Sequence, residues 1–433
     1  MMSTAGLAGV GRVAVMRTTW PVVRQKLLSL MAISALWLAA PVLGLRLSGW
    51  SAALLAVGAV AVEAWPTLAR QISVAVAVAL LAVREPRYAA LHLALVGAVW
   101  VARRRTATLA LTLVTGAVVL PKAAFSLTEG RALADGWLDP ASLAALIFIT
   151  FYWWREARSA RAPAGGATSW GDWCALFLVP FHPVYPVAFG PNDLWRSHRV
   201  DTRLVLGGAL GCVAKAGTLA GLRRLFPGAG YADLSAAALL AMPAARLWAV
   251  VGLNYLELVL LLSGLAEAGI LVARLYGWPL PSPFRFALLA WNPVELWRRW
   301  GIYTRRILLK TVYFPLGGGE RHRFRNVMLT FLASAVIFHS GWLGSPYWTV
   351  GEAGWRDHAL YFGLQGLGVC ACLALWQRRG KDPRADRALR WSPARLVATA
   401  ATQAFSAWAH ILILVPSVPL TGRLRLMARC LGF

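Results

Sequence analysis

The strongest constraint on the fold is a series of apolar blocks, each close to the length of a membrane-spanning helix. A helix needs about 20 mostly apolar residues to cross a bilayer. No single soluble core can bury this much apolar sequence, so the pattern predicts an all-α polytopic membrane protein with about ten transmembrane helices. The blocks lie at 27–45, 51–69, 71–83, 88–102, 106–126, 141–154, 203–221, 234–250, 251–276, 357–376 and 396–415.

Charged residues are few and mostly basic, and they lie between the apolar blocks. They make up 14% of the chain, hydrophobic residues make up 58%, and the net charge is +26. Soluble domains carry about 25% charged residues. Basic loops of membrane proteins stay in the cytoplasm and meet anionic lipid headgroups. The pattern therefore predicts membrane lipids as partners and no nucleic acid. The basic clusters are 103–105, 155–161, 320–325 and 377–395.

A hydrophilic segment at 155–170 divides the chain. It is rich in Arg, Ala, Gly and Pro and contains no apolar run. Residues 1–154 are predicted to form an N-terminal transmembrane bundle, and residues 171–433 a membrane core that carries the motifs described below. The block at 27–45 follows a basic segment, which predicts an uncleaved first span with a cytoplasmic N-terminus. The Arg- and Ala-rich composition points to a bacterial cytoplasmic (inner) membrane.

Three motifs follow one another between residues 292 and 339. The first is the block Asn292-Pro293-Val294-Glu295-Leu296-Trp297-Arg298-Arg299-Trp300. The second is Tyr313-Phe314-Pro315-Leu316-Gly317-Gly318, whose glycines permit a tight turn with φ above zero. The third is an apolar helix, from about residue 325 to 338, that ends on His339.

In this order and spacing, the motifs resemble those of the membrane-bound O-acyltransferase family. The resemblance is sharpest over residues 275–342. It implies short re-entrant or interfacial helices around a central tunnel. It also implies an enzyme that moves an acyl group from a thioester donor, either acyl-CoA or a phosphopantetheine-linked acyl carrier, to a hydroxyl. The acceptor would be a glycan, a lipid or a small alcohol, and no bound cofactor or metal is implied.

The resemblance also assigns roles to residues. His339 matches the histidine of the family and would be the general base. In the block, the amide and the carboxylate would orient the segment, the tryptophans would pack it, and the arginines would hold the donor or the fold. The predicted substrate-binding residues are Asn292, Glu295, Trp297, Arg298, Arg299, Trp300 and Tyr303.

The chain departs from the family pattern directly after the block. Family members usually carry Asn or His there, as the partner of the later histidine, whereas this chain has Gly301. Asn292, Tyr303 and Thr304 are close enough in sequence to supply the missing hydrogen bond. Two other readings stay open. One is a non-catalytic relative that binds lipid or an acyl carrier, and the other is a transporter, although no paired half-repeat is present.

Residues 294–312 are predicted to form one amphipathic helix at the membrane interface. Trp297 and Trp300 are three residues apart and share a helical face, and basic residues recur along the other side. Because Arg binds phosphate with paired donors, the basic side suits a phosphorylated acyl donor. Contact with lipid headgroups is the alternative.

Two histidines lie in apolar segments. His339 is predicted to lie well inside the bilayer, about a dozen residues from a basic edge at ~1.5 Å per residue. Loss of water keeps its imidazole neutral, and a neutral imidazole can accept a proton from a hydroxyl that attacks a thioester. His410 is predicted to be structural, with the role of the missing partner as an alternative.

Two acids interrupt the block at 251–276. Glu257 and Glu267 lie on nearly the same helical face, and acids inside a span are costly and tend to face the bundle interior. Both are predicted to pair with basic residues of the motif block, although the sequence favours a wet edge of the span for Glu267.

Overall fold

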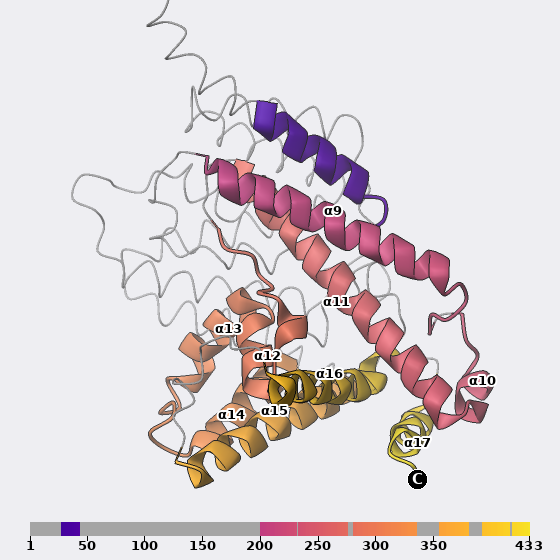
Figure 1. The fold of residues 1–433 in the computed structure, drawn as a ribbon. Coiled ribbons are helices and arrows are strands. Elements are labelled where there is room, and N and C mark those ends of the chain that lie inside the picture. The colour runs from indigo at the N-terminus through magenta and orange to yellow at the C-terminus, as the bar shows by residue number, and fades with distance from the viewer. Residues whose placement is uncertain are drawn as a thin grey trace, which may run out of the picture.

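The computed structural model describes residues 27–43, 200–231, 233–275, 280–335, 355–380, 392–415 and 418–433 (Figure 1). All regular elements in these ranges are helical, beginning with the N-terminal helix Leu27–Ala39. The 3-10 helix η2 (Ala287–Leu289) precedes the motif block, and the π-helix η3 (Leu309–Tyr313) follows it. The α-helices are α9 (Thr202–Leu225), α10 (Ala236–Ala241), α11 (Ala244–Leu275), α12 (Pro293–Arg299), α13 (Ile302–Leu308), α14 (Arg323–Ser334), α15 (Trp355–Arg378), α16 (Pro393–Leu414) and α17 (Leu420–Cys430).

Within the described ranges, four helices are long and apolar enough to cross a membrane. These are Thr202–Leu225, Ala244–Leu271, Arg356–Arg378 and Pro393–Leu414. Three of them, in α9, α15 and α16, match predicted blocks closely. The all-helical prediction is therefore confirmed for the described residues, and four of their helices have the length and composition of membrane spans.

Much of the predicted N-terminal bundle lies outside the described residues. This holds for the blocks between 51 and 154 and for the segment 155–170, so about ten spans and a central tunnel stay predictions. The block predicted at 27–45 forms a helix at Leu27–Ala39, which is shorter than a full span.

The prediction of two spans at 234–250 and 251–276 is wrong. The structure has the short helix α10 and then α11, a single helix of 32 residues. The break falls at Met242, whose ψ of 134° is extended, because the following Pro243 disfavours a helical conformation in the residue before it. Val250 and Val251 carry no such signal, and the helix runs through them.

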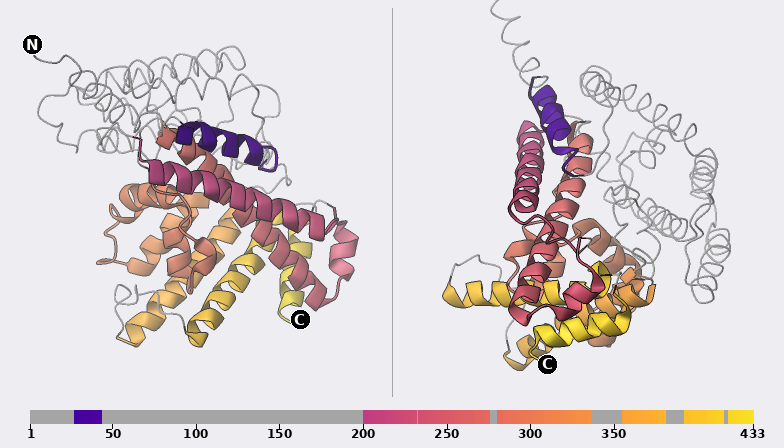
Figure 2. Two further views of the ribbon diagram at one scale, coloured as in Figure 1. Left: turned by 45° about the horizontal axis from the view of Figure 1, so that its top comes forward. Right: turned by 90° about the vertical axis from the view of Figure 1, so that its right-hand side faces the viewer.

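Helices α9 and α11 lie side by side and antiparallel (Figure 1). Near the start of α9, Arg274 Nη1 donates to the carbonyl oxygen of Leu204 at 3.1 Å. Near its end, Arg223 and Glu257 form an ion pair at 3.8 Å. The N-terminal helix lies on this pair (Figure 2), and a methyl group added at Gly264 of α11 would meet Leu43.

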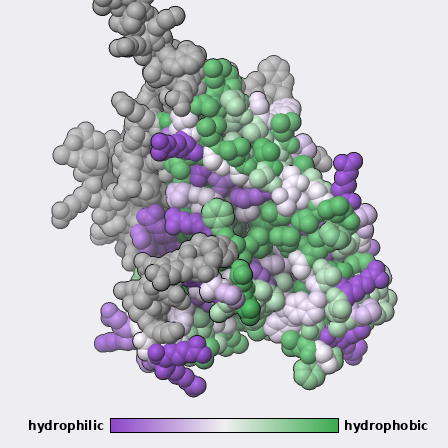
Figure 3. Space-filling model, in the orientation of Figure 1, coloured by the Kyte–Doolittle hydropathy of each residue, from purple (hydrophilic) through white to green (hydrophobic). Residues whose placement is uncertain are grey.

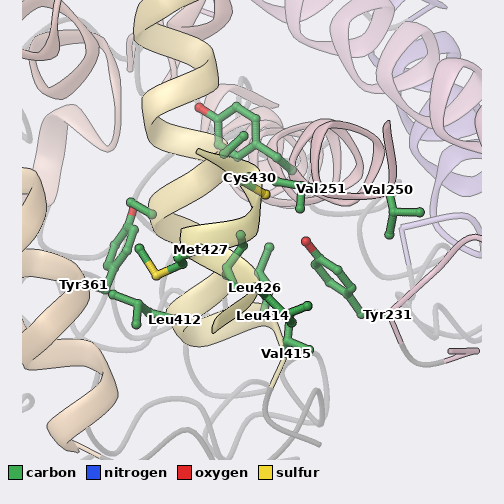
Figure 4. Close-up of a cluster of buried hydrophobic side chains, with 14 of the residues drawn as sticks. Tyr231, Val250, Val251, Tyr361, Leu412, Leu414, Val415, Leu426, Met427 and Cys430 are labelled. Atoms are coloured by element: carbon green, nitrogen blue, oxygen red, sulfur yellow. The ribbon is translucent and has the colours of Figure 1, made fainter. Parts of the chain in front are cut away.

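A second group of helices carries the motifs. Helix α14 packs on α15, α15 packs on both α12 and α16, and α17 packs on α10, α11 and α16. Helix α11 connects the two groups, because it also contacts α16 and α17 (Figure 2). A buried cluster seals this junction (Figure 4). Its labelled members are Tyr231, Val250, Val251, Tyr361, Leu412, Leu414, Val415, Leu426, Met427 and Cys430.

The basic C-terminal segment forms α17, which is part of the core. Its residue Arg423 is only 6% exposed. The Arg423 guanidinium donates to the Leu412 carbonyl of α16 and to Asp357 Oδ2 of α15, the latter at 3.0 Å. Two indoles also bind its backbone: Trp248 Nε1 donates to the Cys430 carbonyl and Trp408 Nε1 to the Met427 carbonyl. This segment therefore ties α11, α15 and α16 together.

Hydrophobic side chains cover a broad area of the face shown in Figure 3. Three of the four candidate spans, those in α9, α15 and α16, expose large apolar side chains, which suits contact with lipid acyl chains. Examples are Leu210, Leu225, Leu360, Leu367, Leu396 and Val397.

Candidate functional site

The motif block forms α12, and its sequence fixes where that helix begins. The Asn292 side chain accepts a hydrogen bond from the Glu295 backbone N–H at 2.8 Å. This is an N-cap, and Pro293 stands at the first helical position, where its missing N–H costs nothing. The amide that the sequence predicted to orient the block therefore does so by capping its helix.

Glu295 is the electrostatic centre of the block. Its side chain is 11% exposed and accepts from Arg298 Nη1 and from Arg299 Nε, the latter at 3.2 Å. Two cations therefore share one carboxylate and leave the block with an excess positive charge. Burial and the nearby Arg298 both lower the pKa of Arg305, which lies on the next helix.

The two arginines differ in their surroundings. Arg299 is 19% exposed at the side chain and lies over the Trp291 ring, 5.1 Å from its centroid. Arg395 at the start of α16 lies over the same ring, at 3.6 Å. Arg298 is 32% exposed and stacks on no ring among the described residues. Arg298 is therefore the more available of the pair for a ligand.

Trp297 docks the block onto α14 and α15. Its Nε1–H donates to Gln365 Oε1 at 3.2 Å. Its ring meets Phe331 of α14 edge to face at 5.1 Å and Phe362 of α15 at 5.7 Å. Gln365 is fully buried in an apolar span, and that lone amide was a signal that the sequence reading passed over.

Trp300 docks the block onto α16. Its ring lies 5.2 Å from Phe284 and 6.2 Å from His410. The segment before the block is held to the same helix, because Gln403 Nε2 donates to the carbonyls of Ala287 and Ala290. The tryptophans therefore pack the block, as expected, against α14 and against α15 and α16, which lie more than sixty residues away in sequence.

The prediction of one amphipathic helix over 294–312 is wrong. Gly301 has φ +53° and ψ 56°, a left-handed conformation that ends α12 and starts α13. On either side of it, Arg285 N–H donates to the Arg299 carbonyl and Ile302 N–H to the Pro283 carbonyl. A left-handed backbone favours glycine at this position, so Gly301, where the resemblance leads one to expect Asn or His, is a turn residue.

Tyr303, one of the candidates for the missing hydrogen bond, has a partner in the segment before the block, and its contact with His339 stays a prediction. Its hydroxyl donates to the Pro281 carbonyl at 2.5 Å, and its side chain is buried. The tyrosine thus fastens α13 to the segment before the block. The predicted substrate-binding residues lie together, in or directly beside α12 and α13. Their contact with a substrate stays a prediction.

The turn motif is held by a residue that the sequence reading missed. Gly317 and Gly318 have φ of +99° and +58°, which confirms the predicted turn. The fully buried Asn326 donates through Nδ2 to the carbonyls of Leu316, Gly318 and Arg321 at 2.7–3.0 Å. An Asn near the start of an apolar helix was its only signal.

Of the two histidines in apolar segments, the structure describes only His410. His339 lies outside the described residues, and the helix that leads toward it, α14, is described to Ser334. His410 is 3% exposed, with Nδ1 at 2.6 Å from the Ser406 carbonyl and Nε2 at 2.9 Å from the Tyr361 hydroxyl. Since a carbonyl only accepts, Nδ1 carries the proton and Nε2 accepts from tyrosine. Both nitrogens are occupied, in agreement with a structural histidine.

The buried acids pair away from the motif block, which corrects the expectation for both. Glu267 is 4% exposed, so the wet edge predicted for it is wrong. It binds Arg274 of its own helix at 2.6 Å, accepts from Ser282, and lies 4.0 Å from Lys215 of α9. Glu257 pairs with Arg223. Helix α9 supplies Lys215 and Arg223, and α11 itself supplies Arg274, in place of the basic residues of the motif block.

No set of three His, Cys, Asp or Glu side chains in the described ranges is placed to hold a metal ion. Compared with models of known protein families, the chain matches none. It matches no curated protein either.

Proposed function

We propose that this chain is a membrane-bound O-acyltransferase that transfers an acyl group from a thioester donor to a hydroxyl acceptor. One observation carries the proposal: the motif block packs directly on the helix that leads to His339, through the contact of Trp297 with Phe331 at 5.1 Å. The three motifs whose order resembles the family thus belong to one packed unit, as a shared reaction centre requires.

The proposed reaction uses His339 as a general base. Its neutral imidazole accepts the proton of the acceptor hydroxyl while the hydroxyl oxygen attacks the thioester carbonyl. The carbon–sulfur bond then breaks, and the thiolate takes up that proton to leave as a thiol. The products are an ester and a free thiol, with no change of oxidation state.

The positive charge of the block supports a phosphorylated donor. Arg298 and Arg299 share only one carboxylate, and Arg305 lies close enough to Arg298 for its pKa to be lowered. A guanidinium binds phosphate with two parallel donors. Coenzyme A and the phosphopantetheine arm both carry phosphate, and the basic cluster at 320–325 predicts that this side of the membrane faces the cytoplasm, where such donors are found.

A second candidate is a non-catalytic relative that binds lipid or an acyl carrier. The conformation of Gly301 favours it, because the position that carries the usual partner is a left-handed turn without a side chain. The two candidates share the fold and the charge of the block and differ only in turnover.

Turnover decides between them. Purified protein is incubated with radiolabelled acyl-CoA or acyl carrier and a panel of alcohols, and ester formation and free thiol are both measured. His339→Ala is expected to lower the rate about 10²–10⁴-fold. His322→Asn is the matched control, because His322 is exposed and its φ of +51° is one that Asn tolerates. Equal, non-zero rates in wild type and His339→Ala would refute the general base, and no turnover with any donor would favour the binding protein.

A further inference from the structure

Helices α15 and α16 are antiparallel, and their register is fixed at two points. Tyr361 lies opposite His410, with 2.9 Å between its hydroxyl and Nε2. Two turns further along α15, a methyl group added at Gly368 would lie 2.8 Å from Phe405 Cε1. Residues between 361 and 368 therefore face residues between 405 and 410. Gln365 and Ser406 fall in this interval.

Both side chains are buried and incompletely bonded. Gln365 is 0% exposed and Ser406 is 1% exposed. Within the described residues, Gln365 Nε2 and Ser406 Oγ have no hydrogen-bond partner. Buried polar groups in proteins are nearly always paired, and a span in lipid offers no water as a substitute. Two such groups at one level of one interface call for a common ligand.

The orientation of the amide is fixed by the motif block. Trp297 Nε1–H donates to Gln365 Oε1 at 3.2 Å, so Nε2 is the end that points away from this indole. The Ser406 carbonyl is occupied by His410 Nδ1, which leaves the hydroxyl as the free group of that residue. The interface thus presents amide N–H donors on α15 and a hydroxyl on α16.

The surroundings select an uncharged ligand. The neighbours of the pair are aromatic or neutral: Trp297, Trp300, Tyr361, Phe362, His410 and Tyr255. The Tyr255 hydroxyl lies beside Ser406 and donates to Gln403 Oε1, and both His410 nitrogens are in hydrogen bonds to neutral groups. An anion would lose its hydration without gaining a counter-charge. A hydroxyl oxygen fits, because it can accept from the amide N–H and donate to a serine oxygen.

We propose that Gln365 and Ser406 bind the hydroxyl of an uncharged, lipid-soluble alcohol between α15 and α16, beside the tryptophans of the motif block. The inference rests on the proposed function and deepens it, since this alcohol is the acyl acceptor. It narrows the acceptor class from glycan, lipid or small alcohol to an alcohol with an apolar chain that reaches the site from the membrane.

Photolabelling tests the site without any turnover. The full-length protein in detergent is irradiated with a diazirine derivative of octanol, and labelled peptides are identified by mass spectrometry. The expected labels fall on α12, α15 and α16 around the pair. Unlabelled octanol should suppress them, whereas methyl heptyl ether, which accepts but cannot donate a hydrogen bond, should not.

Variants assign the labelling to the two side chains. Ser406→Ala and Gln365→Met should each reduce labelling about fivefold, the effect of one hydrogen bond. Ser406→Ala should leave the unfolding temperature without alcohol unchanged or raised, because it removes an unsatisfied group. Thr402→Ala is the control: its hydroxyl lies one turn earlier on α16 and is bonded to the Ala398 carbonyl at 2.7 Å, so labelling should persist.

Three outcomes would overturn the site. They are labels confined to other helices, equal labelling in wild type and both variants, and a lowered unfolding temperature of Ser406→Ala without any labelling, which would mean that an ordered water occupies the position. If the wild-type protein transfers acyl groups but shows no specific labelling around the pair, the site is refuted and the proposed function is not. Specific labelling in a protein whose His339→Ala variant is equally active refutes the proposed mechanism alone.

Discussion

The indole of Trp300 lies against the imidazole of His410, with 6.2 Å between ring centroids and 47° between ring planes. The last residue of the motif block thus meets α16 near its C-terminal end. Tyr361 completes the contact from α15, because its hydroxyl donates to the imidazole and its ring centroid lies 4.5 Å away. Tyr255 of α11 lies 5.0 Å from the same ring, so α11, α15 and the motif block all meet α16 at one histidine.

The pairing of Tyr361 with His410 predicts a measurable coupling. Tyr361→Phe leaves the buried Nε2 without a donor and should lower the free energy of unfolding by about 1–3 kcal/mol. His410→Leu should cost a similar amount. The double variant should recover about 0.5–1.5 kcal/mol relative to the sum. Denaturation of the purified protein in mixed micelles with increasing SDS measures all three, and additive effects would contradict the bond.

The left-handed conformation of Gly301 predicts which substitutions it accepts. An added Cβ meets nothing closer than Thr304 Oγ1 at 4.0 Å, so space is available and the backbone alone decides. Gly301→Asn should cost less than about 1 kcal/mol, and Gly301→Val should cost about 1–2 kcal/mol or more. Purified yield and SDS denaturation report the cost. Gly301→Asn should also raise acyl transfer if the family's partner is otherwise absent, and equal stability of both variants would refute the strain.

The different surroundings of the two arginines predict a split effect. Arg298→Lys should raise the KM for a phosphorylated donor about tenfold, about 1.4 kcal/mol, because Lys lacks the forked donor. Arg299→Lys should mainly lower stability, since Arg299 stacks on Trp291. Donor KM and SDS denaturation are measured for both. An unchanged KM with reduced yield for Arg298→Lys would show that this residue also serves the fold.

The buried pair of Glu267 and Arg274 predicts rescue by a double change. Both side chains are 5% exposed, so Glu267→Gln leaves a buried guanidinium without its charge partner and should destabilise by about 3–5 kcal/mol. Replacing both by Leu and Met removes both charges and should restore most of the loss. SDS denaturation compares the variants. A double variant as unstable as Glu267→Gln would show that the pair is required for more than mutual neutralisation.

Local signals predicted the helices, and long-range packing decided where they break and pair. The blocks now seen as α9, α15 and α16 were readable because apolar length alone defines a span. Pro243 was a readable break that hydropathy obscured. The turn at Gly301 could not be predicted from the sequence, because the hydrogen bonds on either side of it involve residues 283–285. In addition, the arginines before and after it are spaced as they would be on one continuous helix.

The site was readable only in part for the same reason. The residue type and spacing of Trp297 and Trp300 predict that they pack the block. Their partners Gln365 and His410 could not be predicted, because no local sequence pattern gives the register of α15 and α16 against the block. Glu267 was assigned a wet edge although Arg274 lies two turns ahead on the same helix. Its other basic neighbour, Lys215 on α9, is brought close only by the antiparallel packing of α9 and α11.

The ion pair between Arg423 and Asp357 can form only late in the synthesis of this chain. The acid leaves the ribosome 66 residues before its partner, so α15 enters the membrane with a carboxylate that has yet to find its guanidinium. A chain that stops before α17 leaves Asp357 without Arg423. Helices α11, α15 and α16 then also lack the hydrogen bonds that α17 makes with them. Helix α17 therefore completes the packing of α11, α15 and α16 only after all three of those helices have been synthesised.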